Sequence, residues 1–155
     1  MGLSKTIVMY AAILAVLLVG AAFLFGCRKK EPADDILFIN KVEQTDVWIL
    51  PDTEENRDLP YSTPTIDELE ENGQSRLSLQ ALGGPGMYAV HMFAAEGMYY
   101  GVYEVPLEAG YTLKFRRQDW GWMLDVTDKC GKEIASLEVF GAMWAGDGGG
   151  DELDE

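Results

Sequence analysis

The amino-acid sequence predicts an all-β body, a mostly antiparallel β-sandwich of about eight short strands. A hydrophobic helix is expected before this body and a disordered acidic tail after it. The first observation behind this prediction is an uninterrupted apolar run, Thr6–Phe25. The second is the apolar pattern from Ile36 onward, which is short, interrupted and of period two, as is typical of strands. The third is the C-terminal stretch Ala145–Glu155, which consists almost entirely of glycine and acidic residues.

The apolar run is long enough to reach across a membrane. A helix over Thr6–Phe25 would measure about 30 Å, the thickness of the hydrocarbon core of a bilayer. The next residues complete Leu24-Phe25-Gly26-Cys27, which resembles a bacterial lipobox, where the cysteine receives a diacylglyceryl group. This resemblance predicts a lipoprotein signal and membrane anchor over residues 1–27, lipidation at Cys27 and a charged tether over residues 28–35.

An uncleaved single-pass helix is the alternative. Phe25 is bulkier than the residue usual at that place in a lipobox, and the run exceeds the 7–15 apolar residues of an ordinary signal. Basic residues are more numerous after the run (Arg28-Lys29-Lys30) than before it (Lys5). By the positive-inside rule this charge bias places the body in the cytoplasm, whereas a lipidated Cys27 places it outside. The two hypotheses therefore predict opposite sides of the membrane.

Short alternating stretches predict the strands of the sandwich domain, residues 36–142. Pro51 ends one of them, and Glu96-Gly97 closes a hairpin between two that are apolar on both faces. A capping box, Thr65-Ile66-Asp67-Glu68, predicts one or two helical turns over residues 66–71. The expected strands are 36–39, 47–50, 77–81, 88–95, 98–105, 111–116, 120–127 and 134–140. Residues 143–155 cannot bury a core and are expected to be disordered.

Charge and cysteine content limit the partners. The formal net charge is −14, which argues against a nucleic-acid partner, because such binding needs clustered lysine and arginine. Only Arg28-Lys29-Lys30 is suited to lie on lipid headgroups. Two cysteines, Cys27 and Cys130, do not make a disulfide scaffold, and a lipid on Cys27 would leave Cys130 without a partner in the chain.

A family resemblance follows from landmarks that run in order along residues 36–115. They are Phe38-Ile39-Asn40, Val47-Trp48-Ile49-Leu50-Pro51, Leu69 with Asn72-Gly73-Gln74-Ser75, Met87-Tyr88-Ala89-Val90, Val105-Pro106-Leu107 and Gly110-Tyr111-Thr112-Leu113. Their order resembles small bacterial lipoproteins and secreted proteins that carry one β-sandwich module. The resemblance implies a fold and a location at the cell envelope, and it implies no activity.

Residues able to support catalysis or metal binding are few. His91 is the only histidine, and it is in phase with Met87, Ala89 and Phe93, which predicts a strand histidine rather than a catalytic base. No nucleophile elbow accompanies it. His91 and Cys130 are isolated from one another in sequence, so neither a metal nor a cofactor is expected. The acidic stretches Asp52–Asp58 and Asp67–Glu71 are interpreted as solvated loop and helix surfaces.

The segment Arg116–Trp122 is the strongest candidate for a binding surface. Arginine beside tryptophan is typical of interface hot spots and of ligand stacking. The candidate residues are Arg116, Arg117, Trp120 and Trp122. The competing interpretation is core packing, because Trp120 and Trp122 are in phase with Leu124 and Val126.

Three hypotheses of function follow. The first is a membrane-tethered, non-enzymatic envelope lipoprotein that binds a protein or glycan partner or has a structural role. The second is a single-pass membrane protein with a cytoplasmic interaction domain. The third is a hydrolase that uses His91 or a pair of carboxylates.

Overall fold

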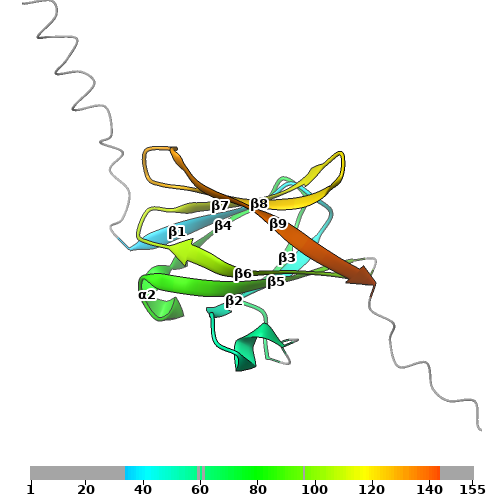
Figure 1. Cartoon of the computed structure of the whole chain (residues 1–155), viewed down its shortest axis with the longest axis horizontal. Helices are drawn as coiled ribbons and strands as arrows, with labels where there is room; N and C mark the ends of the chain where they lie inside the picture. The colour runs from blue at the N-terminus through cyan, green and yellow to red at the C-terminus, as the bar shows by residue number, and fades with distance from the viewer. Residues whose placement is uncertain (1–33, 59, 61, 96, 144–155) are drawn as a thin grey trace, which may run out of the picture. The chain divides into compact units, whose positions relative to one another are not determined.

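The computed structural model describes residues 34–143 except Leu59, Tyr61 and Glu96. Cys27, the expected anchor, most of the tether and the expected acidic tail lie outside the described residues. The elements are β1 (Asp35–Asn40), β2 (Thr45–Pro51), the 3-10 turn η1 (Glu55–Arg57), β3 (Ile66–Leu69), β4 (Gln74–Ser78), α2 (Leu79–Leu82), β5 (Gly86–Ala94), β6 (Met98–Leu107), β7 (Thr112–Gln118), β8 (Gly121–Thr127) and β9 (Glu133–Met143) (Figure 1). The prediction of an all-β body is confirmed.

The strands form one nine-stranded, nearly closed sheet with the order β3-β2-β5-β6-β9-β8-β7-β1-β4. Neighbouring strands are antiparallel except β1 and β7, which are parallel, so the mostly antiparallel arrangement is confirmed. Figure 1 shows β1, β4, β7 and β8 in the upper layer and β2, β5 and β6 in the lower one. No helix among the described residues is long and apolar enough to cross a membrane, and the run Thr6–Phe25 lies outside those residues.

Strand β9 joins the two layers into one sheet. Its first part pairs with β8, from Thr127↔Glu133 to Trp122↔Val139. Its last part pairs with β6, from Gly101↔Phe140 to Met98↔Met143. The sequence pattern predicts the strand but gives no sign of this change of partner, because each part alternates in the same way.

The core lies between the two layers and is built from alternate residues of the strands. Polar side chains are also buried there, and Asn40 at the end of β1 is fully buried. Its Nδ2 donates to the carbonyl oxygens of Glu43 and Leu69 over 2.9 Å each, and its Oδ1 accepts from the Val42 amide over 3.2 Å. Asn40 thereby ties the β1–β2 loop to the β3–β4 turn. Large fully buried core side chains include Ile36, Phe38, Ile49, Met92, Tyr100, Leu113, Phe115 and Leu124.

The helix expected over residues 66–71 is wrong, because Ile66–Leu69 is strand β3. The hydroxyl of Thr65, which was expected to cap the helix, instead accepts a hydrogen bond from the Ile49 amide over 3.0 Å. Glu68 has φ of +49°, which is incompatible with a right-handed helix. Its amide donates to Oδ1 of Asp46 over 2.7 Å, so pairing with β2 has replaced the helical hydrogen bonds.

The strand expected over residues 77–81 ends early, and a short helix follows it. Strand β4 stops at Ser78, whose hydroxyl accepts from the Ala81 amide over 3.3 Å and so caps α2. Gly83 ends that helix with φ of +118°, a backbone conformation that favours glycine. Because Leu77, Leu79 and Ala81 alternate as in a strand, the sequence pattern did not identify Ser78 and Gly83 as helix caps.

Candidate functional site

The predicted binding residues lie at and beside the β7–β8 hairpin. Gln118 pairs with Gly121, so Asp119-Trp120 forms a two-residue loop at the tip. Trp120 is 76% exposed, and its expected place in the core is therefore wrong. The period-two count from Leu124 back to Trp120 passes the first residue of β8 and enters the turn, where strand alternation no longer applies.

Trp122 and Arg117 lie one register step inward from the tip. Trp122 is half-buried and packs on Tyr100 in the core, with ring centroids 4.9 Å apart. The guanidinium carbon of the exposed Arg117 lies 5.8 Å from the centre of the Trp122 ring, a cation–π arrangement. The core interpretation therefore holds for Trp122, and the surface interpretation holds for Arg117 and Trp120.

Arg116 faces away from these residues and is already paired. Its guanidinium donates two hydrogen bonds to the Asp125 carboxylate of β8, and the Ser136 hydroxyl of β9 donates to the same carboxylate over 2.7 Å. Burial raises the pKa of Asp125, but the hydrogen bonds from Arg116 and Ser136 outweigh it, so the pKa is lowered. Arg116 therefore links three strands and is not part of the exposed hairpin surface.

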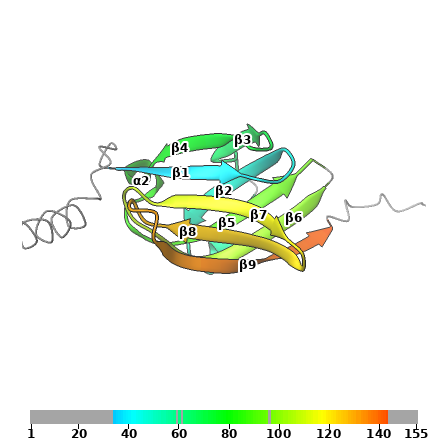
Figure 2. The same ribbon diagram turned by 90° about the horizontal axis from the view of Figure 1, so that it is seen from above.

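The hairpin tip lies far from the point where the chain enters the sheet. Strand β1 begins at Asp35 and runs parallel to β7, with Asn40 opposite Phe115. The register therefore places the tip about eight strand residues beyond Asp35, roughly 25 Å at 3.3 Å per residue. In Figure 2, the start of β1 and the β7–β8 hairpin lie at opposite ends of the sheet.

A second set of side chains, the outer aromatic layer, covers the outer face of β2, β5, β6 and the end of β9. Neighbouring rings lie 5.0–6.0 Å apart between centroids, as in Phe93–Tyr99 and Tyr99–Phe140. These separations are typical of favourable aromatic contacts. The layer consists of Trp48, His91, Phe93, Tyr99, Tyr103 and Phe140.

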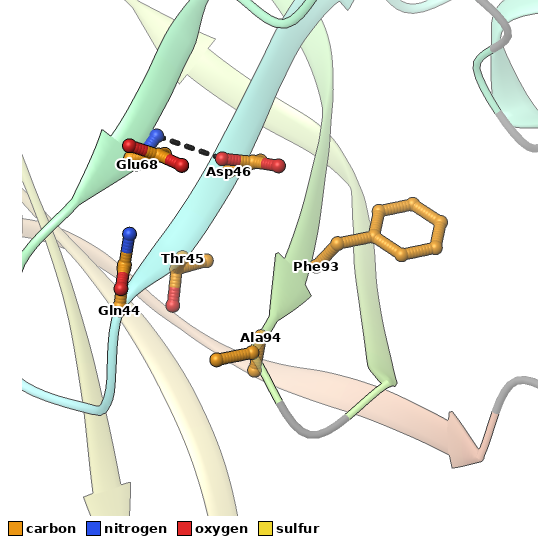
Figure 3. Close-up of a pocket in the computed structure, with 7 residues that line it drawn as sticks. Gln44, Thr45, Asp46, Glu68, Phe93 and Ala94 are labelled. Atoms are coloured by element: carbon orange, nitrogen blue, oxygen red, sulfur yellow. Dashed lines mark hydrogen bonds between the residues drawn. The ribbon is translucent and has the colours of Figure 1, made fainter.

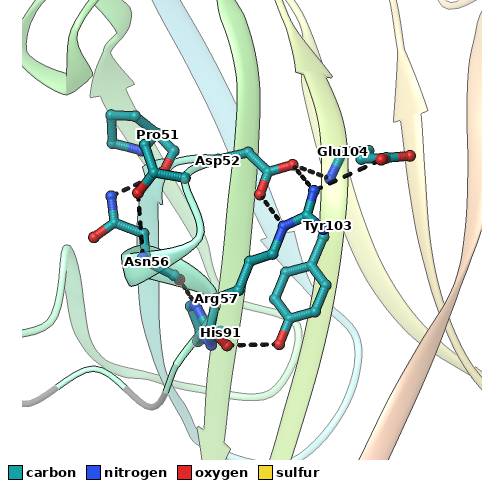
Figure 4. Close-up of polar contacts among 8 residues, drawn as sticks. Pro51, Asp52, Asn56, Arg57, His91, Tyr103 and Glu104 are labelled. Atoms are coloured by element: carbon teal, nitrogen blue, oxygen red, sulfur yellow. Dashed lines mark hydrogen bonds and ion pairs between the residues drawn. The ribbon is translucent and has the colours of Figure 1, made fainter.

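The described part of the segment after β2, residues 52–65 without Leu59 and Tyr61, crosses this layer, and we call it the strap. The indole of Trp48 donates to the Ser62 carbonyl over 2.8 Å, and the Tyr103 hydroxyl donates to the Arg57 carbonyl over 2.7 Å. Arg57 makes a bidentate ion pair with Asp52, with distances of 2.7 and 2.8 Å (Figure 4). The strap is thus held at both ends by polar contacts with the sheet.

His91 lies beneath the strap and is fully buried. Its Nε2 is 2.7 Å from the Asn56 carbonyl oxygen, and its Nδ1 is 2.7 Å from the Tyr99 hydroxyl. Because a carbonyl only accepts, Nε2 carries the proton and Nδ1 accepts from Tyr99. Burial lowers the pKa of His91, and the hydrogen bond to Asn56 opposes this shift. A neutral imidazole with both nitrogens engaged matches the predicted strand histidine and leaves no nitrogen for a substrate.

The acidic residues that the structure describes do not assemble a metal centre. A pocket of about 290 Å³ is lined by Asp46 and Glu68, together with Thr45 and Phe93. Figure 3 shows these side chains. The Asp46 carboxylate already accepts the Glu68 amide. Among the described residues, no group of three or more histidine, cysteine or acidic side chains is placed to hold a metal ion.

Cys130 lies in the turn between β8 and β9 and is not a free thiol. The expectation that Cys130 has no partner in the chain applied only to a chain lipidated at Cys27, so it stays a prediction. Its neighbours in the turn are held by Asp128, whose carboxylate accepts the amides of Cys130 and Lys132 over 2.8 and 2.9 Å.

Comparison with known protein families, curated proteins and solved structures gives no match to this chain. The site must therefore be interpreted from its own geometry. The strap and its contacts with His91 were missed by sequence reasoning, because Asn56 and His91 meet through a main-chain carbonyl, which any residue type carries.

Proposed function

We propose that this protein is a membrane-tethered lipoprotein of the cell envelope whose β-sandwich body is a non-enzymatic binding module. The leader supports the tether, since Thr6–Phe25 is followed directly by the lipobox-like residues ending at Cys27. The ordered landmarks over residues 36–115, which resemble small envelope lipoproteins, support the location. The buried and fully hydrogen-bonded His91 supports a role without catalysis.

The observation that carries the binding role is the exposure of Trp120. A tryptophan that is 76% exposed buries little of its own area, and tryptophan is the residue most enriched in interface hot spots. It lies at the hairpin tip, away from the end where Asp35 continues from the tether. Trp120 and Arg117 are the exposed side chains of this hairpin that we assign to contact with a protein or glycan partner.

Intact mass of the membrane-extracted protein tests the tether. We expect a chain that begins at residue 27 and carries a diacylglyceryl group, and we expect a Cys27→Ser variant to keep its leader. Because Cys27 and Cys130 are the only cysteines, the mass is measured with and without reducing agent. An unlipidated chain that gains two mass units on reduction would show a disulfide instead and would overturn lipidation.

Partner capture from envelope extracts by the full-length protein tests the binding surface. Trp120→Ala and Arg117→Ala are expected to reduce recovery of the captured species by about tenfold or more, the effect of a typical hot-spot residue. Ile134→Ala is the matched control, because Ile134 is also an exposed apolar residue, 40% exposed, at the opposite end of the sheet. Equal recovery with Trp120→Ala and wild type would remove the hairpin from the proposal.

A single-pass protein with a cytoplasmic body is the second candidate. The excess of basic residues after the apolar run favours it. Protease added to intact cells separates the two candidates, after the outer membrane has been permeabilised if the cell has one. Digestion of the body supports the envelope lipoprotein, whereas a protected body of full mass supports the cytoplasmic arrangement.

A further inference from the structure

A fork opens in the sheet where β9 leaves β6. The two strands pair only from Met98↔Met143 to Gly101↔Phe140. Before Phe140, strand β9 pairs with β8 instead. Within the described part of the chain, no strand pairs with Glu133–Val139 on the side that faces β6. The sheet therefore carries an unpaired strand edge about seven residues long, the kind of edge to which an extended peptide adds.

The two sides of the fork are not equivalent. On β6, Pro106 has no amide hydrogen, and the Glu104 amide already donates to Asp52 over 3.1 Å. Glu104 also has φ of +57°, which marks a bulge in this strand. These features block strand addition to β6. Strand β9 has no proline between Glu133 and Val139, so the accessible edge belongs to β9.

A groove of about 380 Å³ lies at the point of the fork. Its residues come from β6, β9 and the strap: Val102, Tyr103, Glu104, Leu137, Glu138, Phe140 and Arg57. Phe140 is 45% exposed, and its ring lies 5.4 Å from that of Tyr103. Aromatic rings at the mouth of a groove attract cations through their faces.

The charge of the groove is negative. Arg57 is neutralised by the bidentate Asp52 and lies 3.6 Å from Glu104. Hydrogen bonding to Arg57 lowers the pKa of Asp52, although burial opposes this, so Asp52 is ionised at neutral pH. Arg57 is thus paired with Asp52 and Glu104, and Glu138 adds a further carboxylate to the groove, so negative charge is in excess. Glu104 has a side chain that is 76% exposed and able to meet a ligand.

We propose that the β6–β9 fork binds an extended basic peptide of a partner protein. The peptide main chain adds to the free edge of β9, and a lysine or arginine side chain enters the groove between Glu104 and Glu138, against Phe140. The aliphatic part of that side chain lies on Val102 and Leu137. This surface is distinct from the β7–β8 hairpin, so it does not depend on the proposed role of Trp120.

Titration of labelled peptides with the full-length protein in non-ionic detergent tests this inference. The probe is an octapeptide of alternating threonine and lysine, with alternating threonine and glutamate as its control. We expect the lysine peptide alone to raise fluorescence anisotropy. Glu104→Gln and Glu138→Gln should each weaken its binding about three- to fivefold, the effect of an exposed ion pair. Glu71→Gln is the matched control, because it removes one exposed charge outside the groove.

Hydrogen exchange gives a second measurement, which non-specific electrostatic attraction of the peptide would not change. Addition of the lysine peptide should slow exchange of amides within Glu133–Val139, and Trp120→Ala should leave both measurements as in wild type. Equal weakening by Glu71→Gln would show non-specific attraction to an acidic protein and would overturn the proposal. Binding without protection of β9, or equal binding of the glutamate peptide, would also overturn it. Dimerisation of the protein without peptide, with the same β9 amides protected, would identify a second copy as the occupant instead.

Discussion

His91 and Asn56 are joined by a 2.7 Å hydrogen bond from an imidazole nitrogen to a main-chain carbonyl, although 35 residues separate them in the chain. This bond fixes the strap to the outer face of β5. It also makes the strap sensitive to acid, because protonated His91 would be a buried charge without a carboxylate partner in its hydrogen bonds.

Acid should therefore weaken the fold as the pH falls below about 6.5, and we follow this dependence down to about pH 4.5. The pKa of His91 is lowered in the folded protein, so the unfolded chain binds more protons in this range. The contribution of His91 is complete above its ordinary pKa of about 6.5. It falls by about 1.4 kcal/mol per pH unit until the lowered pKa is reached.

Urea unfolding followed by tryptophan fluorescence at several pH values checks this dependence. A His91→Gln variant keeps one donor and one acceptor but does not titrate, so its stability should lose the dependence on pH in this window. A slope that persists in His91→Gln would assign the effect to other groups. The lowered pKa values of Asp52 and Asp125 act below about pH 4 and lie outside the window.

Replacing Asn40 by leucine should destabilise the fold by about 3 kcal/mol or more. The variant loses the hydrogen bonds that Asn40 makes to the Glu43 and Leu69 carbonyls and to the Val42 amide. Each buried group left without a partner costs about 1–3 kcal/mol. Chemical denaturation measures the change, and Gln80→Leu, at an exposed position of α2, provides the control for hydrophobic substitution.

Gly101→Ala should destabilise the protein by about 1–3 kcal/mol, because it overpacks the outer aromatic layer. A Cβ atom at this position would lie 2.4 Å from Cζ of Phe140 and 2.8 Å from the Tyr99 hydroxyl. The second contact would also disturb the bond between Tyr99 and His91. Adding Phe140→Ala removes the nearest clash, so the double variant should be less destabilised than the sum of the two single variants. Simple additivity would contradict this account.

Arg116→Met should destabilise the sheet more than an ordinary surface substitution. Arg116 and Asp125 are both largely covered, and removing one partner leaves a partly buried carboxylate without its cation. We expect a loss of about 1–3 kcal/mol, and we expect NMR titration to show a higher pKa for Asp125. In the Asp125→Asn background the same substitution should cost less. Equal costs in both backgrounds would show that the pair is not coupled.

The sequence predicts those parts of the fold that depend on local alternation. The β5–β6 hairpin and the β7 and β8 strands follow directly from their period-two patterns, and each occupies nearly the expected range. Strand β3 could not be predicted in this way, because its geometry depends on Asp46 and Ile49 of another strand. A capping box states a local preference, and here pairing with β2 overrides it.

The candidate surface was predicted in part. Arginine and tryptophan in one short segment indicated a binding surface, and Arg117 and Trp120 are exposed there. The sequence did not separate Arg116 from them, since its partners Asp125 and Ser136 come from β8 and β9. The fork was not predictable either. It arises because Val139 and Phe140, adjacent in the chain, pair with different strands.

The dual pairing of β9 sets the order in which this body can be completed. Eight strands precede β9 in the chain. Strands β6 and β8 each lack one neighbouring strand until β9 pairs with them. The earlier strands are therefore synthesised before the sheet can be completed. Under the proposed envelope location, this late completion would keep the chain unfolded during export until its final strand has crossed the membrane.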